Sequence, residues 1–248
     1  GRIPLWNDSI FGGVSHLGNL QTGALYPLRF LVGGFSPDRA IDLLVALHLV
    51  LLVMTTRWLA ARIGLRPPAG LVAALIVGAG GAATVKTIQF EQFLVLSWTP
   101  LLLIAAHAVI TSPRPWRAAG GLAAVGSAAL FAGHPQITYQ TACLLVAWVL
   151  AWLLVTRDWR RLRPLAAAGG LMVAVSALQL FATLHATAES AMSRYRTISD
   201  LLSPGRSVEP GRLWAVLFGT TRRIDPGAFV GGFEAIGFVG VTAVVLAV

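Results

Sequence analysis

Long apolar segments recur along the chain with short polar links between them, and this pattern constrains the fold more than any other feature of the sequence. Each segment is near the roughly 20 residues that a helix needs to cross the hydrocarbon core of a bilayer. Because backbone groups in lipid must hydrogen-bond within their own segment, such stretches cross as helices, and short links make successive helices antiparallel. The six complete segments are about 40–61, 69–85, 93–110, 118–132, 137–155 and 165–186, and part of a seventh begins near Phe233.

Composition agrees with an integral membrane protein. Of the 248 residues, 56% are hydrophobic and 12% are charged, whereas soluble domains carry about 25% charged residues. We therefore predict an all-α, polytopic transmembrane helical bundle with six complete spanning helices and part of a seventh. The net charge of +9 comes largely from arginines at the ends of apolar segments. Arginines there set topology and contact headgroups, so we expect membrane lipids and no nucleic acid as partners.

The chain divides into four predicted parts. Residues 1–39 are rich in Gly and Pro without regular periodicity, which indicates a first extracytoplasmic loop with interfacial segments and short pieces of helix. Residues 40–186 form the six-helix bundle, 187–232 a second extracytoplasmic loop and 233–248 a truncated spanning helix. Because the chain starts without Met and stops inside an apolar run, we predict an internal piece of a longer protein.

The distribution of arginine predicts the orientation in the membrane. Alternate links contain Arg62 and Arg66, then Arg114 and Arg117, then four arginines within 156–164. Under the positive-inside rule these links are cytoplasmic. Arginine far outnumbers the single lysine, which hints at a GC-rich bacterial genome, so we expect the plasma membrane of a bacterium. Long loops cross largely regardless of their charge. The predicted extracytoplasmic loops are 1–39, 86–92, 133–136 and 187–232.

A four-residue turn, Gly133 to Gln136 (GHPQ), separates two of the spanning segments. Gly and Pro predict a tight hairpin there. His134 and Gln136 lie where unpaired polar groups are costly, which makes them candidates for function. The alternative is that the four residues only cap and turn the chain at the membrane surface.

Unusual polar side chains concentrate in the predicted outer loops. Amides and carboxylates bind sugar hydroxyls, aromatic rings stack on sugar faces, and arginines bind phosphate through paired hydrogen bonds. Together they predict a site for a sugar linked to a lipid phosphate. The candidates for a catalytic acid or base are Asp8, Glu91 and His134, with no role assigned among them. The predicted substrate-binding residues are Asn19, Gln21, Tyr26, Gln92, His134, Gln136, Arg194 and Arg196.

Simpler roles compete with each of these assignments. An arginine near a membrane surface often pairs with ordinary lipid phosphates, and Asp8 suits a turn. No His and carboxylate spacing is typical of zinc, no Gly-rich loop matches a nucleotide fingerprint, and no Ser elbow is present. We therefore predict no metal-ligand set in this sequence, while the cofactor stays open, with a divalent metal as one option.

Several short motifs, in order along the chain, resemble YfhO-like bacterial membrane proteins of the GT-C glycosyltransferase group. The first are GRIPLWN at 1–7, FGG at 11–13, NLQTG at 19–23 and Tyr26-Pro27. The later motifs are the stretch from Gln89 to Pro100, the GHPQ turn and Leu217-Phe218-Gly219.

This resemblance implies transfer of a sugar from a polyprenyl-phosphate carrier to a polysaccharide or lipid acceptor of the cell envelope, on the extracytoplasmic face. In that group the catalytic acid commonly follows the first spanning helix, which places it upstream of this fragment. Asp8 stands where Pro is expected after Trp-Asn and is a candidate substitute acid.

Two other classes of protein stay open from sequence alone. A lipid-linked sugar flippase or transporter needs polar residues through the depth of the bundle, whereas the spanning segments hold few, among them His48 and Gln179. A non-catalytic membrane assembly protein is the second alternative.

Overall fold

The computed structural model describes residues 5–9 and 12–189. Before the first long helix, the chain forms a small antiparallel hairpin of β1 (Trp6–Asn7) and β2 (Val14–Ser15), in which Trp6 is opposite Ser15. A 3-10 turn, η1 (Leu20–Thr22), and the short helix α1 (Pro27–Val32) follow. The pieces of helix in this segment are as predicted. The hairpin was not predicted, because strands of two residues are too short to show a period.

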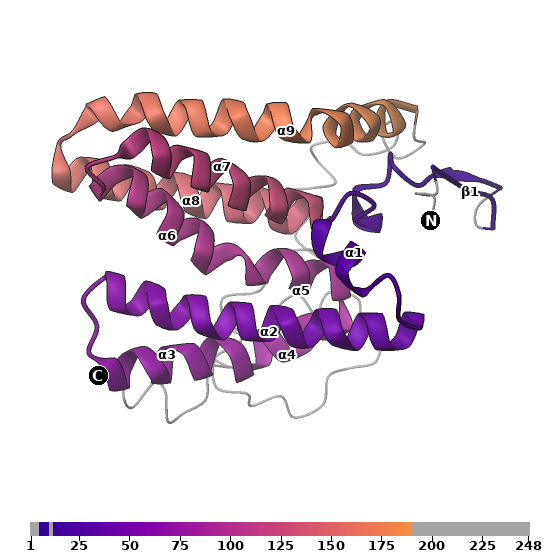
Figure 1. Cartoon of the computed structure of the whole chain (residues 1–248), viewed down its shortest axis with the longest axis horizontal. Coiled ribbons are helices and arrows are strands. Elements are labelled where there is room, and N and C mark those ends of the chain that lie inside the picture. The colour runs from indigo at the N-terminus through magenta and orange to yellow at the C-terminus, as the bar shows by residue number, and fades with distance from the viewer. Residues whose placement is uncertain (1–4, 10–11, 190–248) are drawn as a thin grey trace, which may run out of the picture.

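The rest of the described chain is helical and runs up and down a bundle (Figure 1). In chain order its elements are α2 (Pro37–Arg62), α3 (Pro67–Ala79), α4 (Gly81–Ile88), α5 (Phe90–Ser97), α6 (Thr99–Thr111), α7 (Pro115–Phe131), α8 (Pro135–Thr156), η2 (Trp159–Arg161) and α9 (Leu162–Glu189).

Proline marks the start of most of these helices. Pro27, Pro37, Pro67, Pro115 and Pro135 each occupy the first position of a helix. The fixed φ of proline suits this position, and its missing N–H would have no partner within the helix anyway. The sequence Ser36-Pro37-Asp38 is typical of a helix start, and α2 begins there with Ser36 as its N-cap residue.

Four helical stretches among the described residues are long and apolar enough to cross a membrane: Pro37–Arg62, Phe90–Thr111, Pro135–Thr156 and Trp159–Glu189. The mean hydropathy of the chain is +0.74. The protein is therefore an α-helical, multi-pass membrane protein. Large apolar side chains that face outward on α8 and α9, such as Val155, Phe181 and Leu184, suit contact with lipid.

Two of the six predicted spans are not among these four stretches. The predicted segment 69–85 is divided into α3 and α4 by Gly80, whose extended backbone (φ −68°, ψ 158°) ends α3 at Ala79. The predicted segment 118–132 is α7, a helix of 17 residues. An apolar composition predicts 69–85 as one helix, because it does not register a single residue, here Gly80, that leaves the helical conformation.

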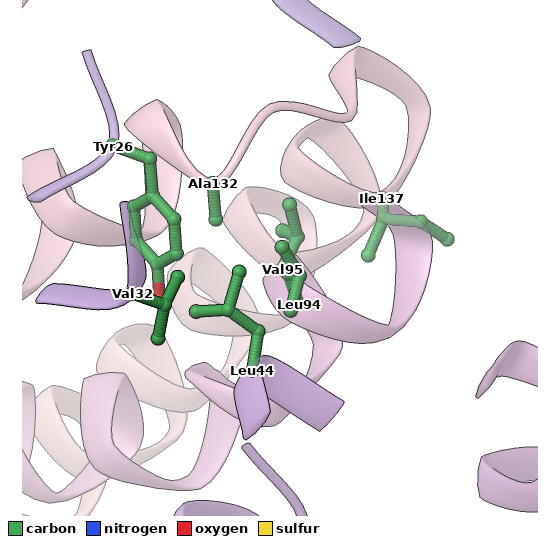
Figure 2. Packing of buried hydrophobic residues seen from close by; sticks show 7 residues of the cluster. All are labelled: Tyr26, Val32, Leu44, Leu94, Val95, Ala132 and Ile137. Carbon is green, nitrogen blue, oxygen red and sulfur yellow. The ribbon is translucent and has the colours of Figure 1, made fainter. Parts of the chain in front are cut away.

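Packing in the bundle joins α2 to α3, α5 and α6 on one side, and α6 to α7 and α7 to α9 on the other. Small residues on α7, such as Ala119 and Ala123, are buried and let helices approach closely. A second group of buried residues lies where α1, α2, α5 and the α7–α8 turn meet (Figure 2). It contains Tyr26, Val32, Leu44, Leu94, Val95, Ala132 and Ile137.

The bundle has two ends of different character. The N-terminal segment and the α7–α8 turn lie at one end, called here the polar end, while the α2–α3, α6–α7 and α8–α9 links lie at the opposite, basic end (Figure 1). Described residues at the basic end include nine arginines and one acid, Asp158. Those at the polar end include three cations and five acids. The separation of charge that the links predicted is therefore present in three dimensions.

Candidate functional site

The N-terminal segment lies directly against the turn between α7 and α8. Gly133 has a φ of +100°, and a Cβ built on it would lie 2.5 Å from the carbonyl oxygen of Leu20. Only glycine combines this backbone conformation with so close an approach. At α9, the Gln179 side chain donates a hydrogen bond of 2.6 Å to the carbonyl of Leu17. The segment is thus tied to two helices at the polar end.

Tyr26 forms the centre of a buried polar network. Its side chain is 0% exposed, and its hydroxyl accepts a hydrogen bond of 2.9 Å from Trp98 Nε1. The same hydroxyl bonds His48 Nε2, while His48 Nδ1 lies 2.7 Å from the carbonyl oxygen of Leu44. That carbonyl can only accept, so we assign the proton to Nδ1 and make Nε2 the acceptor of the Tyr26 proton. Burial raises the pKa of the Tyr26 phenol, which stays neutral.

The hydrogen bonds of Tyr26 give its side chain a structural role. The side chain was predicted to bind substrate, and the structure instead places it inside the protein, between α2 and the α5–α6 junction. Its hydroxyl already serves as donor and acceptor. Its observed contacts position the N-terminal segment on the bundle.

Arg29 is a partly buried cation that sequence reasoning did not select. Its guanidinium lies 5.7 Å from the ring centre of Phe90, and Glu91 is close enough to interact electrostatically. Burial lowers the pKa of the Arg29 guanidinium, while Glu91 and Tyr26 raise it. Among the described residues, the Arg29 Nε atom is buried without a hydrogen-bond partner. A signal was available, because Arg29 follows the Tyr26-Pro27 motif by two residues.

Lys86 is held by two amides from the start of α5. Its Nζ donates a hydrogen bond of 2.9 Å to Gln89 Oε1 and another to Gln92 Oε1. Gln92, predicted to bind substrate, is 8% exposed. The amide oxygen of Gln92 is therefore engaged with the cation inside the protein.

The two polar residues of the GHPQ turn have different environments. His134 is 8% exposed and is the N-cap of α8, where its Nδ1 accepts a hydrogen bond of 3.3 Å from the backbone N–H of Ile137. Gln136, two residues later, is exposed. The predicted hairpin is confirmed, and the capping role given as the alternative is present for His134.

The remaining candidates lie in the N-terminal segment or beyond the described residues. Asn19 is exposed and caps η1 by accepting a hydrogen bond of 3.1 Å from the Gln21 N–H. Gln21 and Asp8 are exposed as well, Asp8 in the link between β1 and β2. Glu91 is partly buried and interacts electrostatically with Arg29. Arg194 and Arg196 lie outside the described residues.

Across residues 5–9 and 12–189, no three His, Cys, Asp or Glu side chains lie together in a way that suits a metal ion. Among the described residues at the polar end, the partly buried charged groups are one carboxylate, Glu91, and two cations, Arg29 and Lys86, and several amides lie at the same end. Such a set can bind a phosphorylated sugar and remove a proton from a hydroxyl.

Comparison with known proteins identifies no relative of this chain: no family model, curated protein or solved structure matches it.

Proposed function

We propose that this chain is a fragment of a YfhO-like membrane glycosyltransferase of the GT-C group. It would transfer a sugar from a polyprenyl-phosphate carrier to a polysaccharide or lipid acceptor of the cell envelope, on the extracytoplasmic face. The observation that carries the proposal is the convergence at the polar end of Arg29, Glu91, Gln92 and His134 with the N-terminal segment. They come from three places that are far apart in sequence: α1, α5 and the α7–α8 turn.

The proposal includes six spanning helices and part of a seventh. Four stretches meet the length for crossing, and α7, with 17 residues, would extend about 26 Å of the roughly 30 Å hydrocarbon core. The α3–α4 pair would complete the sixth crossing, with its break at Gly80 covered by α2, which packs on α3. The arginine-rich basic end is then cytoplasmic, in the plasma membrane of a bacterium.

Binding of the donor phosphate is assigned first to Arg29. A guanidinium that is partly removed from water and lacks a full set of hydrogen bonds interacts strongly with a phosphate oxygen. Arg194 and Arg196 are further candidates for the same phosphate. The exposed amides of Asn19, Gln21 and Gln136 are available for hydroxyl groups of the sugar or acceptor.

The proposed reaction is a displacement at the anomeric carbon of the sugar. The acceptor oxygen forms a bond to that carbon, the bond from carbon to phosphate oxygen breaks, and the lipid phosphate leaves with the electron pair. A carboxylate takes the proton of the acceptor hydroxyl. Of the three candidate bases, Glu91 has the placement that fits best, because Arg29 beside it would hold the departing phosphate. A catalytic acid upstream of this fragment is the alternative source of that carboxylate.

Transport of a lipid-linked sugar is a weaker explanation. Two polar residues within the spanning helices that a transport path could use, His48 and Gln179, have hydrogen-bond partners in the protein. His48 is bonded to Tyr26 and Leu44, and Gln179 to Leu17 and Thr183. Both serve to attach the N-terminal segment, so neither is evidence for a path through the bundle.

The test is a transfer assay on the full-length protein in membranes, with a panel of radiolabelled polyprenyl-phosphate sugars. Glu91→Gln should lower transfer by about 100-fold or more, the size expected for loss of a general base. Arg29→Gln should lower it by about 100-fold through loss of charge stabilisation. The matched control is Arg117→Gln, an exposed arginine at the basic end, which should keep wild-type activity.

Each variant is also checked for a wild-type elution profile and melting temperature. Full transfer by folded Glu91→Gln would leave the base upstream of this fragment. Full transfer by both Glu91→Gln and Arg29→Gln would show that the polar end is not the site.

A further inference from the structure

A cavity of about 260 Å³ lies at the basic end, between the last turns of α2 and the first turn of α3. It is far along the bundle from the residues of the proposed transfer site, so it needs a separate explanation. Two of its lining residues, Arg57 and Arg66, are exposed arginines. Most of the rest of the lining is apolar and includes Met54, Trp58 and Leu65.

The two arginines have no acidic partner within the described part of the chain. The acid at this end, Asp158, forms its ion pair with Arg161 at 2.9 Å. Nine arginines and one acid therefore leave a large excess of positive charge at the end of the bundle where the cavity lies. Charge complementarity requires the occupant to be an anion.

The apolar part of the lining narrows the choice of anion. Trp58 is 46% exposed, and the guanidinium of Arg62 lies 5.4 Å from its ring centre. A tryptophan beside arginines at a helix end is typical of the level of the lipid headgroups. A ligand that matches charged and apolar lining at once is amphipathic, with a phosphate next to a hydrocarbon chain.

The start of α3 makes the arginines essential to such binding. A helix N-terminus usually offers free backbone N–H groups to a phosphate. Here the first two residues of the helix are Pro67 and Pro68, which have none. The charged donors of the cavity are the side chains of Arg57 and Arg66.

We propose that this cavity binds the headgroup of an anionic glycerophospholipid from the surrounding leaflet. Arg57 and Arg66 hold the phosphate, and Met54, Trp58 and Leu65 contact the glycerol and the upper part of an acyl chain. The site is independent of sugar transfer, because it lies at the opposite end of the bundle.

The test is native mass spectrometry of the purified full-length protein, titrated with phosphatidylglycerol or with phosphatidylcholine of the same acyl chains. We expect phosphatidylglycerol to bind about tenfold more tightly. Arg57→Gln combined with Arg66→Gln should remove this preference. The matched control combines Arg114→Gln with Arg117→Gln, which removes the same charge from the same end but outside the cavity, and it should keep the preference.

Equal losses in the two double variants would overturn the proposal, because the attraction would then belong to the whole basic end. Equal binding of the two lipids by the wild-type protein would also overturn it. So would competition by glycerol 3-phosphate at the same concentration as the lipid, since the apolar lining would then contribute nothing. If the cavity double variant fails to fold, Arg66→Gln alone should weaken phosphatidylglycerol binding several-fold, and unchanged binding would refute the site.

Discussion

At the scale of single residues, Tyr26 connects three elements that are distant in sequence. Its hydroxyl meets His48 of α2 and Trp98 at the α5–α6 junction, while its ring lies in the buried cluster that includes Ala132 and Leu94 (Figure 2). Each polar atom in this network has a partner that supplies the opposite role. Because the network is buried, removal of one member leaves the polar atoms of the others without hydrogen bonds, which lowers the free energy of unfolding.

Tyr26→Phe should therefore destabilise the protein by about 1–3 kcal/mol, since His48 Nε2 and Trp98 Nε1 would both lose their partner. Thermal unfolding of the detergent-solubilised protein should show a midpoint lowered by roughly 3–10 °C. Tyr139→Phe is the control, because Tyr139 is 70% exposed on α8, and its effect should stay below about 0.5 kcal/mol. Equal midpoints for the two variants would mean that the buried network contributes nothing.

At the candidate site, the environment of single residues could not be predicted from the sequence. It identified the segments that converge, because polar residues are conspicuous between apolar runs. It did not separate buried from exposed side chains within those segments. Tyr26 is enclosed by partners 22 and 72 positions away, and Arg29 depends on Phe90 and Glu91 for its environment. Such long-range contacts leave no local pattern in the sequence.

At the scale of elements, the α7–α8 hairpin depends on a backbone contact with η1. The GHPQ turn places Gly133 under the carbonyl of Leu20, and the next residue, His134, caps α8. A side chain at Gly133 would meet backbone, which cannot move aside as the end of a flexible side chain can. The turn is therefore both a connection and part of the seat for the N-terminal segment.

Gly133→Ala should reveal this contact when it is compared with Gly64→Ala. Both glycines have positive φ, +100° and +88°, but a Cβ at Gly64 would have nothing within 4 Å. Gly64→Ala then measures the backbone strain alone, about 1–2 kcal/mol. Gly133→Ala adds the clash with Leu20 and should cost at least about twice as much in the free energy of unfolding. Equal costs in chemical denaturation would show that η1 does not rest on the hairpin.

Element boundaries show which local signals are reliable in this chain. Proline fixes its own φ and removes a donor, so the helix starts at Pro37 and Pro135 could be predicted within a residue or two. The break at Gly80 could not, because it lies among glycines that would equally suit close helix packing. The glycines of α7, at 120 and 121, stay helical in a similar sequence.

At the scale of the whole molecule, the charges at the two ends are the feature most directly encoded in the sequence. Links that alternate along an up-and-down bundle must gather at the same end, so the grouping of arginines followed from the order of the helices alone. Arg161 connects two of these links, because it donates a hydrogen bond of 2.7 Å to the carbonyl of Ser112. Which end faces the cytoplasm depends instead on membrane insertion, and the positive-inside rule predicts the basic end.

Cysteine labelling can test this orientation, because Cys143 is the single cysteine of the chain. In a Cys143→Ala background, Gln136→Cys at the polar end and Arg160→Cys at the basic end both replace exposed residues. A maleimide that cannot cross membranes should label Gln136→Cys on intact cells. It should label Arg160→Cys only after the membrane is permeabilised.

The reverse result would place the polar end in the cytoplasm. A sugar site there would lie on the wrong side for transfer to the envelope, although the internal packing would be unchanged. Labelling of both positions on intact cells would mean that the chain crosses the membrane an even number of times, or not at all, between 136 and 160. Because α8 alone joins these positions, that outcome would show that α8 does not span the membrane. We would then expect this apolar helix to lie along the membrane interface.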